Sequence, residues 1–473
     1  MTRPSLKESA LRLLPLAWPV FIGQIAVLTF STVDTVMVAR ASALDLAALA
    51  VGASTYISIF VGLMGVIQAV GPIAGQLFGA GKLRQSGHEA EQGVWLALAL
   101  SLLGCTFLLW PEPFLALART EPAVAEKVRG YLHGLAFALP AALIFMAYRS
   151  FNVAVSRPKA VMVLQLGGLA LKVPLNALLV FGFALPTPFG EWRVPALGAP
   201  GCGMATAIVM WCQLLAAITL LRRDPFYAPF GLGRRLSRPN RASMAALLRL
   251  GIPMGLSILI EVTGFTFMAL FISRIGATPV AGHQIAVNMV SLMFMLPLSI
   301  ANASAVLVAQ RIGAGDAADA SRIGWAGLEI GVLCAAVLGS SVYLLRESII
   351  GLYTGNPVIV AAALPLLAWV VLFHVADAAQ TIAAFVLRAH RIATVPLIVY
   401  VVAIWVIGLG GGYVVAFVAT EVGPAWLHGA RGFWSMATLG IGLAAVSLSG
   451  FLGWTLRRER RLALAIRQPA ARS

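Results

Sequence analysis

Long apolar stretches recur along the whole 473-residue chain and are separated by short polar or Gly/Pro-rich breaks. Each stretch is close to the ~20 residues that a helix needs to cross ~30 Å of hydrocarbon. Strands of a transmembrane barrel would instead alternate over segments of ~10 residues. The pattern therefore predicts twelve membrane-spanning helices, near residues 13–38, 47–76, 93–110, 131–153, 160–184, 199–221, 246–273, 282–310, 323–345, 358–387, 393–418 and 433–455.

The composition excludes a soluble protein. Hydrophobic residues make up 60% of the chain and charged residues 11%, whereas about a quarter of a soluble domain is charged. The first apolar stretch is too long for a signal peptide and no small-residue cleavage site follows it, so we expect it to remain as the first helix. The cysteines have no paired spacing and are interpreted as small packing residues. They are Cys105, Cys202, Cys212 and Cys334.

The cations predict the topology. The formal net charge is +16, and the clusters of Lys and Arg residues fall in segments on the side of the N-terminus. By the positive-inside rule this side is cytoplasmic, with both termini inside, and we expect a bacterial inner-membrane protein. Nucleic acid is not an expected partner, because the cations lie in short loops rather than on one basic face. These cations are Lys82, Arg84, Arg157, Lys159, Arg222, Arg223, Arg234, Arg235, Arg238, Arg241, Arg457, Arg458, Arg460 and Arg461.

An internal repeat relates the two halves of the chain at an offset of 234 residues. Because each half has six helices, both enter the membrane from the same face. We therefore expect a pseudo-two-fold axis along the membrane normal and a substrate site between the halves near the midplane. The predicted organisation is an N-terminal lobe (1–222), a cytoplasmic linker (223–243), a C-terminal lobe (244–456) and a basic tail (457–473). The aligned pairs include Pro19 with Pro253, Arg40 with Arg274, Ala47 with Ala281, Gln76 with Gln310, and Gly79-Ala80-Gly81 with Gly313-Ala314-Gly315.

Ionisable side chains inside hydrocarbon cost at least ~2.5 kcal/mol, so those within the predicted helices are candidates for function. Glu261 is the sole ionisable residue in 250–273, and a carboxylate at this depth must be neutralised by a proton, a metal ion or a partner. Asp377 lies in the middle of a later helix, with His374 and Gln380 three positions to either side on one helical face. This polar stripe is expected to face a cavity or another helix, either for function or as an interhelical hydrogen-bond network.

A second polar group lies in the first half. Asp34 is about two turns from the end of its helix, where Arg40 or interfacial water is within reach, so functional and structural interpretations both stay open. Asn176 either completes a polar pocket or satisfies backbone groups freed by Pro174. Lys172 is either a counter-ion for Asp34 or a cation that snorkels toward the interface.

Other polar residues and motifs add little chemistry. Gln284, beside His283 at the outward start of the helix predicted over 282–310, is expected either to line an entrance or to make a structural hydrogen bond. The sequence contains no recognisable nucleophile elbow, zinc-protease motif or phosphate loop, so we do not expect an enzyme. No cofactor is expected, and the energy for transport would come from a gradient of Na⁺ or H⁺.

Several short motifs, in this order and spacing, resemble the multidrug and toxic compound extrusion (MATE) family and, within it, the NorM-type branch. The resemblance covers essentially the whole chain. It implies a V-shaped arrangement of two six-helix lobes that exports organic cations in exchange for Na⁺ or H⁺. The motifs are Pro19 with Gln24, Val33-Asp34-Thr35-Val36-Met37-Val38, Ala74 through Gly81, Pro174-Leu175-Asn176, Gly201 through Thr206, Pro253 through Glu261, Gly282-His283-Gln284-Ile285-Ala286, Gln310 through Gly315, and Asp377.

The resemblance also implies roles for individual residues. Glu261 and Asp377 match the cation-binding carboxylates of the C-terminal lobe and are the expected Na⁺ ligands, and Asp34 matches the first-helix aspartate of the N-terminal lobe. Asn176 matches a polar neighbour of that aspartate. One departure concerns the coupling ion: Phe373 stands four residues before Asp377, where the family has a tyrosine of the cation site. A phenyl ring has no oxygen for Na⁺, so proton coupling competes with Na⁺ coupling.

The resulting hypothesis is an antiporter that works by alternating access. An outside cation or proton would neutralise Asp34 or the Glu261/Asp377 pair, release a cationic drug, and let the lobes rock inward. The expected partners are small organic cations and membrane lipids, and we expect a monomer. The alternatives are a lipid-linked oligosaccharide flippase of the same superfamily, a membrane-embedded transferase and a passive channel. The residues expected to line the substrate cavity are Asn176, Gln284, His374, Gln380 and Lys172.

Overall fold

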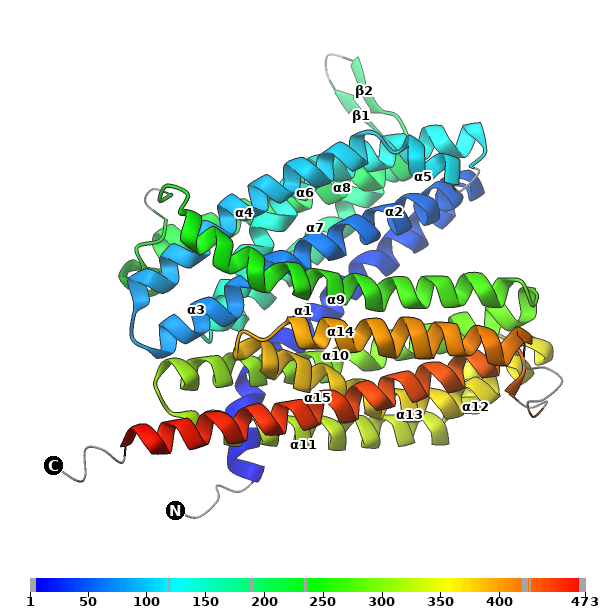
Figure 1. Ribbon diagram of the computed structural model, residues 1–473. Helices are drawn as coiled ribbons and strands as arrows, with labels where there is room; N and C mark the ends of the chain where they lie inside the picture. The colour runs from blue at the N-terminus through cyan, green and yellow to red at the C-terminus, as the bar shows by residue number, and fades with distance from the viewer. Residues whose placement is uncertain are drawn as a thin grey trace. The chain divides into compact units, whose positions relative to one another are not determined.

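The computed structural model describes residues 6–117, 120–187, 190–233, 236–418, 424 and 427–467, and nearly all of them are helical (Figure 1). Within these residues, twelve helices are long and apolar enough to cross a membrane. They confirm the predicted all-α fold with twelve spans. The spans are α1 (Leu6–Ala41), α2 (Ala43–Ile67) with α3 (Val70–Gly79), α4 (Leu83–Leu109), α6 (Pro122–Ala154), α7 (Pro158–Phe181), α8 (Ala199–Arg223), α9 (Arg241–Ser273), α10 (Ala277–Gly313), α11 (Ala317–Leu344), α13 (Pro357–Ala389), α14 (Thr394–Tyr400) with the π-helical η2 (Val401–Gly411) and η3 (Val414–Val418), and α15 (Ala430–Arg467).

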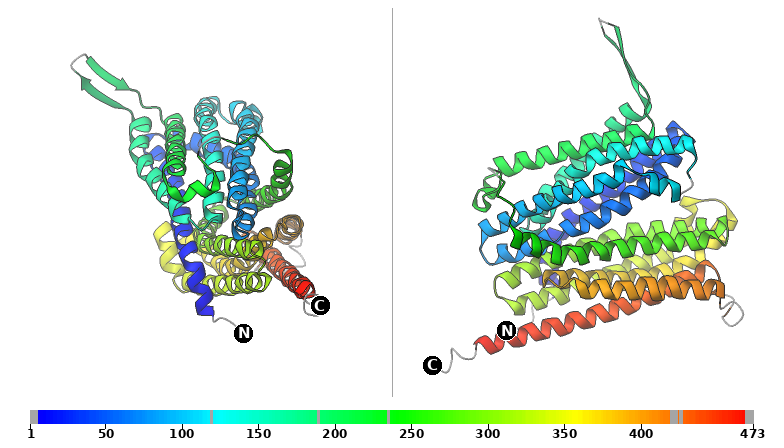
Figure 2. Two further views of the ribbon diagram at one scale, coloured as in Figure 1. Left: turned by 90° about the vertical axis from the view of Figure 1, so that its left-hand side faces the viewer. Right: turned by 45° about the horizontal axis from the view of Figure 1, so that its top comes forward.

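Short elements between the spans were not predicted. They include a β-hairpin that projects beyond the helices (Figure 2). The helix predicted to reach residue 184 ends instead at Phe181. The reason is Gly182, whose φ of +74° is accessible to glycine at no steric cost and turns the chain into the first strand. The short elements are α5 (Glu112–Leu117), β1 (Phe183–Thr187) paired antiparallel with β2 (Gly190–Val194), the 3₁₀-helix η1 (Pro225–Phe230) and α12 (Arg346–Tyr353).

The chain forms two compact units. Unit 2 comprises Ile22–Gly255, and its α6 packs against α2, α4 and α8. Unit 1 comprises Met1–Phe21 and Leu256–Ser473, and its α13 packs against α10, α11 and α15. The divisions after Phe21 and Gly255 are 234 residues apart, which is the offset of the sequence repeat. The two units are therefore built from equivalent parts of the two halves.

The divisions fall inside α1 and α9 rather than in the linker 223–243. In unit 1, the start of α1 is held by Arg12, whose Nη1 lies 3.1 Å from Asp319 Oδ2. In unit 2, the start of α9 is held by Ser243, whose Oγ donates to Glu89 Oε1 at 2.7 Å. Each of these two helices thus begins in one compact unit and ends in the other, so the units do not coincide with the two halves of the sequence.

The linker belongs to unit 2 and packs against the rest of that unit through η1. Tyr227 is buried and its hydroxyl donates to Asn152 Oδ1 at 2.6 Å. Asp224 accepts from the backbone N–H of Phe226, and together with the guanidinium of Arg157 this bond lowers the pKa of Asp224 below its ordinary value. The predicted loop is therefore held in place by specific contacts. The predicted cytoplasmic cations Arg234 and Arg235, the side chain of Arg460, and the tail after residue 467 lie outside the described part of the chain.

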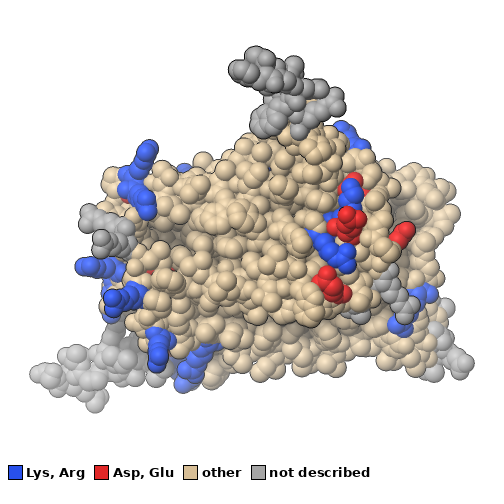
Figure 3. All heavy atoms as spheres, turned by 90° about the horizontal axis from the view of Figure 1, so that it is seen from above, with Lys and Arg blue, Asp and Glu red and all other residues tan. Residues whose placement is uncertain are grey.

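The surface distribution of charge agrees with a membrane location. On the face drawn in Figure 3, Lys, Arg, Asp and Glu gather toward two opposite ends, with a broad uncharged band between them. Such a band is expected where side chains meet hydrocarbon, because an exposed charge there is costly. One ion pair at the helix ends joins Lys127 Nζ, near the start of α6, to Asp45 Oδ1, near the start of α2, at 2.9 Å. Which end faces the cytoplasm stays a prediction from the loop charges.

Glycines allow α6 and α8 to approach closely, and this contact gives a testable prediction. A Cβ on Gly134 would lie 2.7 Å from the backbone carbon of Gly203 and 2.8 Å from the nitrogen of Met204. Backbone atoms cannot rotate away as a side chain can. Gly134→Val should therefore lower the free energy of unfolding by about 1–3 kcal/mol. Gly167→Val is the control, because a Cβ on Gly167 meets nothing within 4 Å. Thermal unfolding of the two purified variants checks this, and equal midpoints would contradict it.

Candidate functional site

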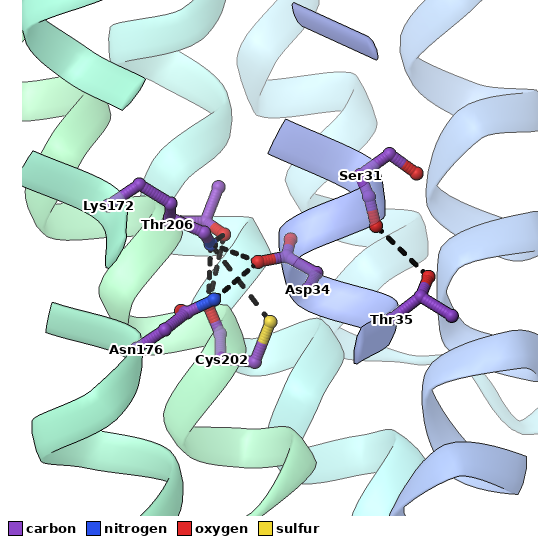
Figure 4. A network of polar contacts seen from close by, with 7 residues as sticks. All are labelled: Ser31, Asp34, Thr35, Lys172, Asn176, Cys202 and Thr206. Carbon is purple, nitrogen blue, oxygen red and sulfur yellow. Dashed lines mark hydrogen bonds and ion pairs between the residues drawn. The ribbon is translucent and has the colours of Figure 1, made fainter. Parts of the chain in front are cut away.

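A buried polar cluster in unit 2 joins three helices around Asp34 (Figure 4). Lys172 Nζ lies 3.0 Å from Asp34 Oδ1. Asn176 Nδ2 donates to the same oxygen at 2.7 Å. The lysine ammonium also donates to the carbonyl oxygen of Cys202 at 3.3 Å and to the hydroxyl of Thr206. Asp34 comes from α1, Lys172 and Asn176 from α7, and Cys202 and Thr206 from α8.

Helical spacing explains why these side chains converge. Lys172 and Asn176 are four positions apart on α7, and Cys202 and Thr206 are four apart on α8, so each pair shares a helical face. Thr206 Oγ1 donates its hydrogen to the Cys202 carbonyl at 3.0 Å. The lone pairs of the Thr206 oxygen therefore stay available to accept from the lysine ammonium. Gly201 keeps α8 close to α7, since a Cβ there would lie 2.3 Å from the Leu179 carbonyl oxygen.

The cluster is electrically paired. Lys172 is fully buried, and the side chain of Asp34 is 14% exposed. An ammonium has three N–H donors, and Lys172 has three oxygen acceptors in Asp34, Cys202 and Thr206. Lys172 therefore acts structurally as a counter-ion to Asp34, one of the two roles that the sequence left open, while Arg40 is exposed at the end of α1.

A second cluster lies in unit 1. Asp377 is 3% exposed, and its Oδ1 accepts from Gln380 Nε2 at 2.8 Å. The same amide nitrogen donates to Thr381 Oγ1 at 3.0 Å. Glu261 of α9 lies within electrostatic range of Asp377, and the buried guanidinium of Arg388 lies within range of Glu261. The structure thus brings together the two carboxylates that the sequence singled out.

An apolar pocket opens beside Glu261. Its cavity volume is about 30 Å³, which is room for about one water molecule. Phe265 and Phe373 supply aromatic surface, with ring centroids 5.8 Å apart. The π-helical segment η2 contributes to another wall, and such segments occur frequently at functional sites. The lining residues are Glu261, Gly264, Phe265, Met268, Phe373, Ile404, Gly408, Leu409, Ala437 and Ile441.

None of the five residues predicted to line the substrate cavity lines this pocket. Asn176 and Lys172 belong to the Asp34 cluster, and Gln380 is hydrogen-bonded to Asp377. His374 is fully buried, and neither ring nitrogen has a hydrogen-bond partner. Gln284 is exposed on α10. Neither is among the residues that line the pocket beside Glu261, so the polar stripe on α13 divides, with Asp377 and Gln380 bonded together and His374 apart.

Some residues at the two clusters were not assigned a site by the sequence. Cys202 was interpreted as packing, yet its carbonyl holds Lys172. Thr206 appeared only as part of a motif, and Arg388 was not singled out. The four-residue spacing of Cys202 and Thr206 places both on one face of an apolar helix, but this spacing alone does not assign Thr206 to a site.

The described residues contain no group of three or more His, Cys, Asp and Glu side chains suited to a metal ion. A hard cation such as Na⁺ would need oxygen ligands in addition to Glu261 and Asp377. Phe373 provides none, while the side-chain amide oxygen of Gln380 has no partner. The ligand oxygens available near Glu261 and Asp377 therefore do not decide between Na⁺ and H⁺ as the ion that these two carboxylates would bind.

The fold defines a multi-pass membrane protein whose two helical units each enclose charged side chains. The MatE family model matches the chain twice, over residues 19–178 and 253–414, and the two matches begin 234 residues apart. The chain belongs to the MatE family, the MATE transporters. This membership confirms the predicted family and the internal repeat.

Relatives over nearly the full length indicate the NorM-type branch. The chain is 39% identical over 448 residues to a probable multidrug resistance protein NorM of Aromatoleum aromaticum, covering 94% of this chain and 93% of the relative. It is 35% identical over 457 residues to the multidrug resistance protein NorM of Vibrio cholerae, covering 96% and 97%. Together with the twelve spans, these bacterial relatives support an inner-membrane location.

Solved structures support the fold. A eukaryotic MATE transporter, AtDTX14, superposes with a TM-score of 0.82 at 19% identity, covering 97% of this chain and 99% of that chain. The Vibrio cholerae MATE transporter VcmN in its bent form superposes with a TM-score of 0.82 at 16% identity, covering 96% and 98%. At this identity the similarity concerns the architecture alone.

Proposed function

We propose that the protein exports small organic cations across the bacterial inner membrane in exchange for H⁺ or Na⁺. The relatives are named multidrug resistance proteins, which supports the substrate class. The observation that carries the proposal is a pair of interacting carboxylates, Glu261 and Asp377, of which Glu261 lines an apolar pocket with aromatic walls.

The proposed mechanism follows from electrostatics. A carboxylate in a low-dielectric site is stabilised by one positive charge and gains little from a second. An organic cation whose apolar body lies against Phe265 and Phe373 can supply that charge, aided by cation–π attraction. A proton or Na⁺ can supply it instead. Binding of the coupling ion from outside therefore releases the organic cation, and alternating access makes the exchange directional.

The proposed function is tested by ethidium transport in proteoliposomes that contain the purified full-length protein. We expect ethidium to accumulate against its gradient under an imposed pH gradient, an imposed Na⁺ gradient, or both. Collapsing the gradient with an ionophore should abolish accumulation. Equal ethidium fluxes with and without every imposed gradient would indicate passive permeation and would refute the proposal. Because Phe373 lacks a ligand oxygen, we expect the pH gradient to be the stronger driver.

A further inference from the structure

The Asp34 cluster differs in one respect from the carboxylate pair of unit 1: it contains its own cation. Lys172 is fully buried, and its ammonium contacts three oxygen acceptors at once, as Figure 4 shows. The ring of Phe30, one turn before Asp34 on α1, lies 5.8 Å from the ammonium. No donor of the ammonium is left over for another partner.

Burial makes this arrangement persistent. An unpaired ammonium or carboxylate in a low-dielectric interior is expensive, so each charge stabilises the other in its ionised form. Lys172 reaches Asp34 from within the same compact unit. The pair can therefore remain intact while the two units move, provided that unit 2 moves as a body.

We propose that Lys172 is a tethered counter-ion that occupies the position a coupling cation would take at Asp34, so that unit 2 neither binds nor releases an ion during transport. Ion exchange is then left to Glu261 and Asp377 in unit 1. This inference rests on the proposed exchange function and specifies which carboxylates serve it. Lys172 is a positioning residue, because it acts on the reaction through the charge of Asp34.

The other groups around Asp34 are consistent with a neutral site. Tyr131 on α6 and Cys202 on α8 are the titratable groups recorded in electrostatic contact with Asp34 besides Lys172. Both are uncharged acids near neutral pH. Asn176 and Thr206 are uncharged donors or acceptors. Among the residues that the structure describes, the charges at this site are thus one carboxylate and one ammonium, which sum to zero.

The proposal predicts how Asp34 titrates. The experiment measures the infrared band of protonated carboxyl groups in the ligand-free, full-length protein and follows its change between about pH 5 and 8. The proteins compared are wild type, Lys172→Met and Asp34→Asn/Lys172→Met. We expect the titrating band of wild type to equal that of the double variant, because Asp34 stays ionised. Lys172→Met should gain the band of one additional carboxyl group, because Asp34 then lacks its cation and takes up a proton.

A second readout measures protons released when each protein binds tetraphenylphosphonium, a cation without titratable groups. Wild type and the double variant should release the same number of protons per bound cation, because Asp34 contributes none in either protein. A titrating carboxyl in wild type that disappears in the double variant would overturn the proposal, since Asp34 would then take up a proton despite Lys172.

Folding and the proposed function are controlled separately. The double variant replaces both charges with neutral groups of similar size. If Lys172→Met fails to fold, the wild type can still be compared with the double variant, and equal titrating bands in these two proteins are the expected result. The infrared comparison needs no ligand and no transport. Failure of wild type to bind tetraphenylphosphonium would count against the proposed function, and the infrared result would still decide the role of Lys172.

Discussion

Replacing either carboxylate of unit 1 by its neutral isostere should abolish coupled export while the protein stays folded. Glu261→Gln and Asp377→Asn each remove a charged partner for the bound cation, and a hydrogen bond to a charged group contributes about 1.5–3 kcal/mol. This loss corresponds to roughly 10- to 100-fold weaker cation binding. Gradient-driven ethidium transport in proteoliposomes measures the effect.

The matched control is Glu347→Gln, which removes an exposed carboxylate on α12 and should leave transport unchanged. Thermal unfolding of all three variants separates lost coupling from lost structure. Removing a buried carboxylate spares the desolvation of its charge, so we expect Asp377→Asn to unfold at or above the wild-type temperature. Glu261→Gln also removes an anion near the buried Arg388, so we expect it to unfold at a lower temperature than Asp377→Asn. Wild-type transport by both variants would refute the assignment of these two residues.

The largest expected effect on stability comes from breaking the buried ion pair of unit 2. Asp34→Asn leaves the ammonium of Lys172 without its anion inside the protein, and removing one partner of a buried pair costs about 3–5 kcal/mol. Asp34→Asn/Lys172→Met removes both charges and should regain most of that loss, because a buried pair is often no more stabilising than neutral groups of similar volume. Thermal or denaturant unfolding of the two variants measures the difference.

The exposed ion pair between Arg129 and Glu112, at 3.3 Å, provides the control. Glu112→Gln should cost only ~0–1 kcal/mol, because solvent screens both charges. If Asp34→Asn were no less stable than Glu112→Gln, or if the double variant were no more stable than Asp34→Asn, the charges of Asp34 and Lys172 would not be coupled as the geometry indicates.

The number of spans could be predicted from the sequence because hydrocarbon thickness fixes the length of an apolar helix. Features that depend on single residues or on local turns could not. The hairpin after Phe181 follows from the backbone of Gly182, and η1 follows from burial of Tyr227. Neither has a distinct hydropathy pattern.

The division into compact units also lay beyond the sequence pattern. The polar linker suggested a boundary at 223–243, but the contacts of Arg12 with Asp319 and of Ser243 with Glu89 connect residues far apart in the chain. Such contacts leave no local signal. The internal repeat is consistent with the observed boundaries, because both unit boundaries fall at equivalent positions of the two halves.

The candidate site was predictable in its charged members and less so in its neutral ones. Asp34, Glu261 and Asp377 stood out because a charge in hydrocarbon is costly. The choice between a paired and a snorkelling Lys172 depended on which way α7 faces, which the structure determines through the contacts with Cys202 and Thr206. Hydrogen-bonding side chains such as Thr206 are common in apolar helices, so their positions alone could not assign them to the site.

The central claim is that an organic cation and the coupling ion compete for Glu261 and Asp377. It is tested most directly by equilibrium binding of tetraphenylphosphonium to the purified protein at varied pH and Na⁺ concentration. We predict that the apparent Kd rises as H⁺ or Na⁺ rises, and that this dependence is lost in Glu261→Gln/Asp377→Asn. A Kd that is independent of both ions in wild type, or a dependence that persists in the double variant, would contradict the account.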